Sequence, residues 1–188
     1  MIKLSADFSE DFYGLHVRLA TVDDAEFIYG LRTAPKVAPF MHNDGCSVET
    51  QREWLKEYKR REANGEEYYF VYEDQTGPVG VLRLCHFTEH DYHCSSWAFK
   101  ENIPSHYAFA GALFAREIAF ERLGFDEEVN WRDGILAINR NVISFMKILG
   151  WKQTGEHYEG DIKMVTGVLT KEDYLKNKEK VLRFIPKD

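Results

Sequence analysis

The sequence lacks the cysteine pattern of a disulfide framework or a zinc site. It has three cysteines, Cys46, Cys85 and Cys94, an odd number without CxxC spacing. It also lacks any run of roughly 18 consecutive apolar residues, so we expect no membrane-spanning helix. The N-terminal segment carries early acidic residues and no long apolar stretch, unlike a signal peptide. These absences predict a cytoplasmic protein with no metal site and no membrane partner.

Basic residues are too few for a general nucleic-acid binder. The chain has 24 Lys and Arg against 31 Asp and Glu, a formal net charge of −7. Because such binding needs a basic face that neutralises phosphates, we expect no nucleic-acid partner. No repeat or flexible linker divides the 188 residues. We therefore predict one domain over residues 1–188, with its core at about 15–170 and a charged tail at 171–188.

Hydrophobic periodicity and helix-capping residues predict the order β-α-α-β-β-β-α-β-α-β, in which the last β is a hairpin of two strands. Mixed strands and helices of this kind predict an α+β or α/β fold around one central sheet. The expected strands are 15–20, 68–73, 79–87, 93–99, about 128–138, 151–158 and 163–169. The expected helices are 21–33, 47–64, 105–124 and 142–149, with a short surface helix in the tail.

Several segments resemble motifs of the GNAT acetyltransferases, in the family's order and spacing. Residues 139–151 resemble its Asn-x-x-(Ala/Ser)-x-x-x-Tyr-x-Lys-x-Gly-Phe pattern, with Asn139 in first place. Residues 32–54 resemble the N-terminal half of the ribosomal-protein N-terminal acetyltransferase subgroup, and residues 99–120 stand where that subgroup has its pyrophosphate loop and following helix. The resemblance covers about residues 15–170. It implies an α+β fold in α/β/α layers with a mixed, mostly antiparallel sheet, and transfer of an acetyl group from acetyl-CoA to a primary amine.

A narrower likeness is to the aminosugar N-acetyltransferases of pseudaminic-acid biosynthesis. The shared features are an Arg-x-x-Pro segment that ends in Met41, the strand at 68–73, the pair Phe99-Lys100 and residues 119–121. This likeness implies that the acceptor is the amino group of a nucleotide-linked sugar.

The family resemblance implies three sets of contacts with acetyl-CoA. The pyrophosphate would meet backbone N–H groups at the start of the helix near residue 105, although the family's glycines are missing there. The pantetheine arm would pair with the strand backbone at 97–99, and Asn139 would reach the pantetheine or the sulfur side of the cleft. An ordinary helix start, a buried strand centre and a capping asparagine are the alternatives. The implied residues are Trp97, Ala98, Phe99, Ser105, His106, Tyr107, Ala108, Asn139, Phe145 and Met146.

A general base is expected near the strand at 93–99, because the acceptor amine must be neutral before it attacks a thioester. This stretch contains His86, Glu89, His90 and His93, and a histidine titrates near neutral pH. We favour His93, which lies nearest to the strand, with Glu89 as a second candidate. Surface histidines on a hairpin are the alternative.

The group that protonates the departing thiolate is less clearly marked. Met146 stands where the family often has tyrosine, and methionine donates no proton. Ser144 is the candidate in its place, with water or an unassisted departure as the alternatives. Cys94 is expected to be a small buried residue rather than a nucleophile.

Acceptor specificity is expected from the loop between the first two helices and from the last hairpin. Phe40, Met41 and His42 would form an apolar wall with a polar edge, unless they are simply core residues. The leading acceptor class is a small-molecule amine. A protein N-terminus is the rival acceptor, and a non-catalytic GNAT-fold binding module is the rival from another class. The sequence does not decide between a monomer and a homodimer.

Overall fold

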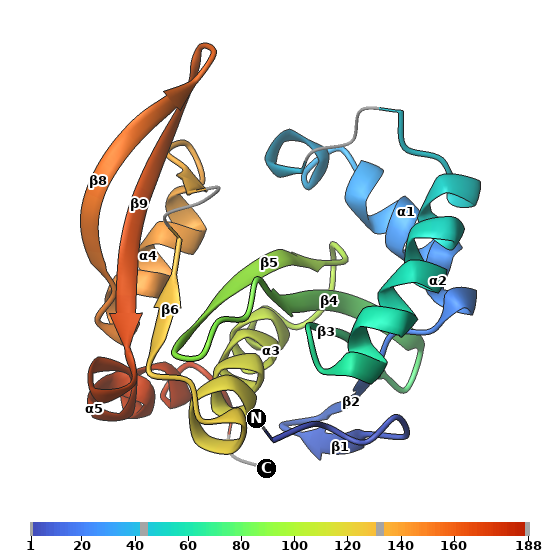
Figure 1. Ribbon diagram of the computed structural model, residues 1–188, viewed down its shortest axis with the longest axis horizontal. Coiled ribbons are helices and arrows are strands. Elements are labelled where there is room, and N and C mark those ends of the chain that lie inside the picture. Colours follow the sequence, from blue (N-terminus) through green and yellow to red (C-terminus); the bar gives the residue numbers. More distant parts are fainter. Residues whose placement is uncertain (1, 42–44, 131–133, 187–188) are drawn as a thin grey trace.

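A sheet of nine strands forms the centre of the described structure (Figure 1). This computed structural model describes residues 2–41, 45–130 and 134–186. The strand order is β1-β2-β3-β4-β5-β6-β9-β7, and β8 pairs with β9. The strands are β1 (Ser9–Phe12), β2 (Leu15–Leu19), β3 (Tyr68–Asp74), β4 (Gly77–Cys85), β5 (Asp91–Phe99), β6 (Glu127–Val129), β7 (Ile135–Leu136), β8 (Lys152–Glu159) and β9 (Ile162–Thr170). The α-helices are α1 (Ala25–Thr33), α2 (Val48–Asn64), α3 (His106–Glu117), α4 (Arg140–Leu149) and α5 (Lys171–Leu182).

The central strands are buried on both faces of the sheet. Successive side chains of β3 point to opposite faces, so Tyr69 and Val71 pack with α1 and α2, while Phe70 and Tyr72 pack with α3. This burial explains why β3 is almost continuously apolar. The expected α+β fold in α/β/α layers, with a mixed, mostly antiparallel sheet, is confirmed.

Capping residues set the helix ends that the sequence predicted. Ser47 accepts a hydrogen bond from the Thr50 backbone N–H at 3.1 Å and begins α2. Gly65 follows the helix at a φ of 77°, a left-handed conformation that glycine adopts without a steric penalty. Within the described ranges, no helix is both long and apolar enough to cross a lipid bilayer.

Two predicted segments differ from the observed ones. The single strand expected at about 128–138 is in fact two short strands, β6 and β7, which pair with different parts of β9. The helix expected at 105–124 is α-helical only to Glu117, and a π-helical turn then runs over Ile118–Leu123. A further strand, β1, was not predicted, because its alternating residues are only half-buried.

The C-terminal helix is part of the hydrophobic core rather than a surface appendage. Tyr174 of α5 is buried and stacks on Phe120 with 5.0 Å between ring centroids. Asn177 donates a hydrogen bond to the carbonyl oxygen of Leu149 at 3.3 Å, which fastens α5 to the end of α4. The structure confirms a helix in the tail, but the prediction that this helix lies on the surface was wrong, because one face of α5 is buried.

Candidate active site

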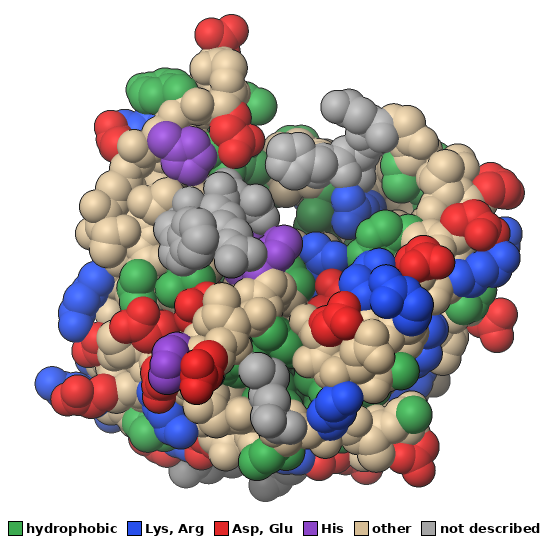
Figure 2. All heavy atoms as spheres, in the orientation of Figure 1, with side chains coloured by type: hydrophobic (Ala, Val, Ile, Leu, Met, Phe, Trp, Pro, Cys, Tyr) green, Lys and Arg blue, Asp and Glu red, His purple; other side chains and the backbone are tan. Residues whose placement is uncertain are grey.

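A cleft opens where β5 and β6 separate. These strands form the one parallel pair among the described strands, and they pair only at Asp91–Glu127 and Tyr92–Glu128. Beyond this point β6 pairs with β9 instead. The resulting cleft has a volume of about 410 Å³ and is lined by β5 on one side and by α4, β7 and β9 on the other. Figure 2 shows the surface hollowed between these two sides of the molecule.

His93 bridges the two strands at the point where they separate. Its Nδ1 lies 2.9 Å from the carbonyl oxygen of Val129 on β6, and the side chain is almost fully buried while lining the cleft. A carbonyl oxygen can only accept, so Nδ1 carries the proton. In the neutral ring Nε2 is then the basic nitrogen. This arrangement suits a general base.

Asn130 and Trp151 form a hydrogen-bonded pair next to His93. The indole Nε1–H of Trp151 donates to Asn130 Oδ1 at 2.9 Å, and Asn130 Nδ2 lies 3.4 Å from His93 Nδ1. Asn130 and Trp151 are both buried, and Asn130 lines the cleft. Because the indole fixes which end of the amide points at His93, the asparagine has one orientation.

The other candidate bases lie outside the cleft. Glu89 is exposed in the connection between β4 and β5, at the end where β5 and β6 are still paired. His90 is exposed beside Asp126, with 3.1 Å between His90 Nδ1 and Asp126 Oδ2. His86 is exposed, with its ring centroid 5.9 Å from that of His93. Of the histidines in this stretch, the structure brings His93 to the cleft.

A buried ion pair forms the floor of the cleft. Arg116 on α3 donates to Glu128 Oε1 on β6 at 2.8 Å, and the two side chains are 2% and 1% exposed. Arg116 also donates to the carbonyl oxygen of Ala112 at 2.9 Å, and the Tyr92 hydroxyl donates to Glu128 at 3.2 Å. Charges this deep need such partners. Sequence reasoning missed the pair, although an arginine on the apolar face of a predicted helix was a usable signal.

A β-bulge shapes the cleft wall on β5. The ladder between β4 and β5 passes from Val81–Ala98 to Arg83–Ser95, so two residues of β5 face one residue of β4. Ser96 lies in this bulge at a φ of 52°. The backbone of the bulge is therefore released from regular pairing with β4, next to the cleft.

The three residues predicted to line the pantetheine arm have different surroundings. Trp97 lines the cleft, and its ring centroid lies 4.9 Å from that of Phe145. Ala98 is buried with α1 and α2. Phe99 fills the space beside Gly80, where an added Cβ would lie 2.2 Å from the ring. The last two side chains are core groups, so any contact with a ligand there would be through their backbone.

The start of α3 is open to solvent. Ser105 precedes the helix and is exposed together with Pro104. His106, Tyr107 and Ala108 are half-buried, and the backbone N–H of Tyr107 donates to the carbonyl oxygen of Pro104 at 3.0 Å. The described residues that line the cleft do not include this turn. Its proposed contact with pyrophosphate stays a prediction, with an exposed helix end in its favour.

The residues of α4 divide between the cleft and the solvent. Asn139 caps the helix, with its Oδ1 3.4 Å from the Val142 backbone nitrogen, and it also lines the cleft. Met146 lies on the cleft side with its sulfur 3.0 Å from an Arg116 nitrogen. Ser144 is exposed, because two residues along a helix reach a different face from Met146. The structure does not bring Ser144 to His93.

Cys94 and Met146 both lie at the cleft without an evident catalytic role. Burial raises the pKa of the Cys94 thiol well above its ordinary value, although the charge of Arg116 opposes this effect. The thiol is therefore protonated at neutral pH and a poor nucleophile. Cys94 is half-buried and lines the cleft, so its expected role as a small buried residue stays a prediction.

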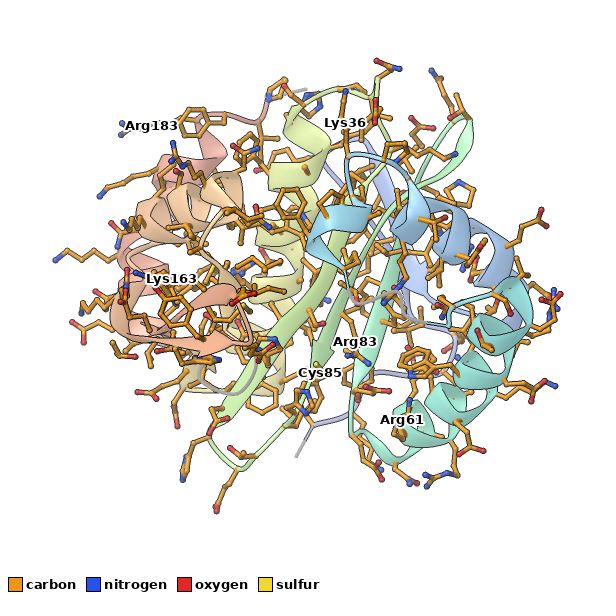
Figure 3. The ribbon with its side chains drawn as sticks, turned by 90° about the horizontal axis from the view of Figure 1, so that it is seen from above. Lys36, Arg61, Arg83, Cys85, Lys163 and Arg183 are labelled. Carbon is orange, nitrogen blue, oxygen red and sulfur yellow. The ribbon has the colours of Figure 1, made fainter. Side chains whose placement is uncertain are left out.

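The opposite rim of the cleft carries the predicted acceptor wall and two arginines that sequence reasoning missed. Phe40 and Met41 line the cleft, and His42 lies outside the described residues. Arg32 at the end of α1 and Arg83 on β4 line the same space. Figure 3 shows Arg83 on the side of the sheet that faces α2. Among the described residues, no group of three or more His, Cys, Asp or Glu side chains is arranged to hold a metal ion.

The chain matches a family model over most of its length. The model of the acetyltransferase (GNAT) domain matches residues 15–152. No curated protein matched the chain.

Solved structures share this fold. The chain is similar to apo FdhC, described as a nucleotide-linked sugar GNAT, with 30% identity, a TM-score of 0.78, and coverage of 96% of this chain and 99% of that one. It is similar to the ribosomal-protein-S5-alanine acetyltransferase of Vibrio fischeri, with 17% identity, a TM-score of 0.74 and coverage of 89% and 99%. It is also similar to the spermidine N-acetyltransferase of Vibrio cholerae in complex with CoA and spermine, with 16% identity, a TM-score of 0.70 and coverage of 86% and 98%. At such low identity, the last two show the fold alone.

Proposed function

Because the chain belongs to the GNAT family of acetyltransferases, we propose that it transfers an acetyl group from acetyl-CoA to the primary amine of a nucleotide-linked aminosugar. The observation that carries this proposal is the placement of His93 in the cleft between the diverging strands. Its Nδ1 is engaged by the carbonyl oxygen of Val129, which leaves Nε2 as the basic nitrogen.

The proposed reaction is a direct attack of the amine on the thioester. His93 Nε2 takes a proton from the acceptor ammonium, and the neutral nitrogen bonds to the acetyl carbon. The carbon–sulfur bond breaks, and the second proton of the acceptor nitrogen passes through water to the departing thiolate, because Met146 has no proton to give and Ser144 is exposed on another face of α4. Backbone N–H groups of the β5 bulge at Ser96 are the candidates to stabilise the carbonyl oxygen.

The acetyl donor would lie along the opening between β5 and α4. Its pantetheine amides would pair with the β5 backbone at 97–99, next to Asn139. Its pyrophosphate would lie at the exposed start of α3. Ser105 and His106 stand there in place of the family's glycines, and backbone N–H groups at a helix start attract anions whichever side chains they carry.

Support for an aminosugar acceptor comes from the likeness to FdhC. That protein is described as a nucleotide-linked sugar GNAT, and the likeness spans 96% of this chain at 30% identity. The alternative, a protein N-terminus, is suggested by the resemblance of residues 32–54 to the ribosomal-protein N-terminal acetyltransferases and by a structure that is 17% identical. A relative at that identity carries no argument about the acceptor.

The test is a release assay for free thiol. Each reaction would contain the protein, acetyl-CoA and one amine. The amines are nucleotide-linked 4-amino and 3-amino sugars, spermidine, and peptides that have a free alanine N-terminus. We expect thiol release with an aminosugar that far exceeds release with spermidine or peptide. Release only with peptide would replace the acceptor. No release with any amine, together with no thermal shift by acetyl-CoA, would overturn the enzyme assignment.

A further inference from the structure

Three neighbouring strands place a row of polar side chains on the face of the sheet under α1 and α2. Tyr69 of β3 pairs with Arg83 of β4, and Arg83 pairs with Ser95 of β5. Residues paired across a sheet share one face, and Tyr69 belongs to the core cluster of α1 and α2. His93 precedes Ser95 by two residues and therefore lies on this face as well.

Arg83 is held rigidly and carries charge that its protein partner does not fully offset. Its guanidinium lies 5.1 Å from the Trp54 ring and 3.4 Å from Glu67 Oε2. The same Glu67 also pairs with Arg61 at 2.8 Å. One carboxylate thus serves two guanidiniums, and the buried Arg83 Nε makes no hydrogen bond with any residue that the structure describes.

Arg32 reaches the same space from α1. It lines the cleft together with Arg83. Both arginines act on Tyr69: burial raises the pKa of the Tyr69 hydroxyl, and the positive charges of Arg32 and Arg83 oppose that rise. Arg83 is paired with Tyr69 across the sheet, and Arg32 belongs to α1, which packs over Tyr69, so both arginines lie on the side of the cleft away from α4.

Acidic residues outnumber basic ones in the whole chain, whereas arginines outnumber carboxylates among the described residues that line the cleft. The other charged residues that line it are Arg116 and Glu128, which neutralise each other, and Glu159 of β8, which lies 3.6 Å from His157 Nε2. Arg32 and Arg83 therefore bring two positive charges to the cleft against the one carboxylate of Glu159, in a chain with a formal net charge of −7. A low-dielectric cleft with two guanidiniums selects an anion, and a planar guanidinium suits phosphate oxygens.

We propose that Arg32 and Arg83 bind the diphosphate of the acceptor nucleotide, an inference that rests on the proposed function. The spacing suits this ligand. His93 and Ser95 are roughly 6.6 Å apart along β5, and Ser95 is the direct neighbour of Arg83. A sugar ring can span this distance, with its amine at His93 Nε2 and its anomeric phosphate at the arginines.

The test measures nucleotide binding apart from catalysis. UDP and TDP are titrated by calorimetry into protein saturated with CoA, so that the nucleotides cannot occupy the CoA site. Arg32→Gln and Arg83→Gln are each expected to weaken binding about tenfold or more, the equivalent of one lost charged hydrogen bond. Arg61→Gln is the matched control, because it shares Glu67 and Trp54 with Arg83 but does not line the cleft among the described residues. It should change binding less than about twofold.

A second variant distinguishes loss of the binding site from loss of folding. Arg83→Lys keeps the charge and loses the planar fork, so it should bind UDP more weakly than the unmodified protein and more tightly than Arg83→Gln. Equal UDP affinity in all these proteins, or no UDP binding once CoA is present, would overturn the inference. UDP binding that depends on the arginines, without acetyl transfer, would contradict the proposed function and support the diphosphate site at Arg32 and Arg83. Acetyl transfer that is unchanged in Arg32→Gln and Arg83→Gln would support the proposed function and contradict the diphosphate site.

Discussion

The indole of Trp151 and the side chain of Asn130 form a hydrogen bond of 2.9 Å that orients the amide beside His93. Trp151 directly follows the turn that ends α4, and Asn130 directly follows β6. The bond therefore joins the two parts of the chain that border the cleft behind His93. An aromatic residue without the N–H would fill the space but leave the amide free to flip.

Replacement of Trp151 by phenylalanine tests this role. We expect Trp151→Phe to lose about 1 kcal/mol of unfolding free energy, the usual value of one hydrogen bond. We also expect kcat to fall about tenfold, because the amide next to the base is no longer fixed. The KM for acetyl-CoA should stay unchanged. Tyr174→Phe, which removes a bond of 3.0 Å to Glu121 far from the cleft, is the control: equal losses of kcat in both variants would reduce Trp151 to a structural residue.

Substitution of His93 separates the candidate bases. His93→Gln should lower kcat by about 10² to 10⁴, the typical contribution of a general base, while a thermal shift by acetyl-CoA is retained. Glu89→Gln and Ser144→Ala should change kcat less than about threefold, since both side chains are exposed outside the cleft. Kinetics of the three variants at saturating acetyl-CoA provide the measurement. A larger loss in Glu89→Gln than in His93→Gln would contradict the assignment.

Removal of one charge of the buried Arg116–Glu128 pair should lower the free energy of unfolding strongly. Glu128→Gln leaves Arg116 almost fully buried without a counter-charge, so the unfolding free energy should fall by about 3 kcal/mol or more. The double variant Arg116→Met with Glu128→Leu removes both charges and should be less destabilised than the single variant. Denaturant unfolding of both proteins measures the difference. If the double variant loses as much as the sum of the losses measured for Arg116→Met and Glu128→Leu made singly, the pair is not energetically coupled.

The Arg18–Asp24 pair should make stability depend on acid pH. Burial by itself would raise the pKa of Asp24, but hydrogen bonds from Arg18 and Thr21 outweigh burial and hold it below its ordinary value. A pKa that is lower in the folded state contributes stability above the unfolded pKa of about 3.9, and this contribution is lost as the pH falls through the folded value. Asp24→Asn should therefore cost about 2 kcal/mol at pH 7.

The difference between Asp24→Asn and the unmodified protein should shrink as the pH falls below about 4 and disappear only below the folded pKa, where Asp24 is protonated in both states. Asp23→Asn, an exposed neighbour, should stay within about 0.5 kcal/mol at every pH. Urea unfolding from pH 3 to pH 8 provides the measurement. A gap that is as large at pH 3 as at pH 7 would mean that the ion pair is not its source.

Local sequence signals were sufficient for most of the fold and for part of the site. The cap at Ser47 and the glycines that end α2 and α4 act within one helical turn, and the structure has these ends as predicted. Asn139 caps α4, which begins at Arg140, two residues before the predicted start. The position of His93 near a strand also pointed to the cleft. The split between β6 and β7 was missed, because it depends on how each pairs with β9, far along the chain.

The sequence by itself determined the order of the strands and helices, the capped helix ends and the family resemblance, because these depend on neighbours along the chain. Only the tertiary structure decided which polar groups meet. Strand register puts Tyr69, Arg83 and Ser95 in one row, the separation of β5 from β6 brings His93 to Val129, and the packing of α3 joins Arg116 to Glu128. These contacts link residues that are 12 to 36 positions apart, and no local pattern fixes such pairings.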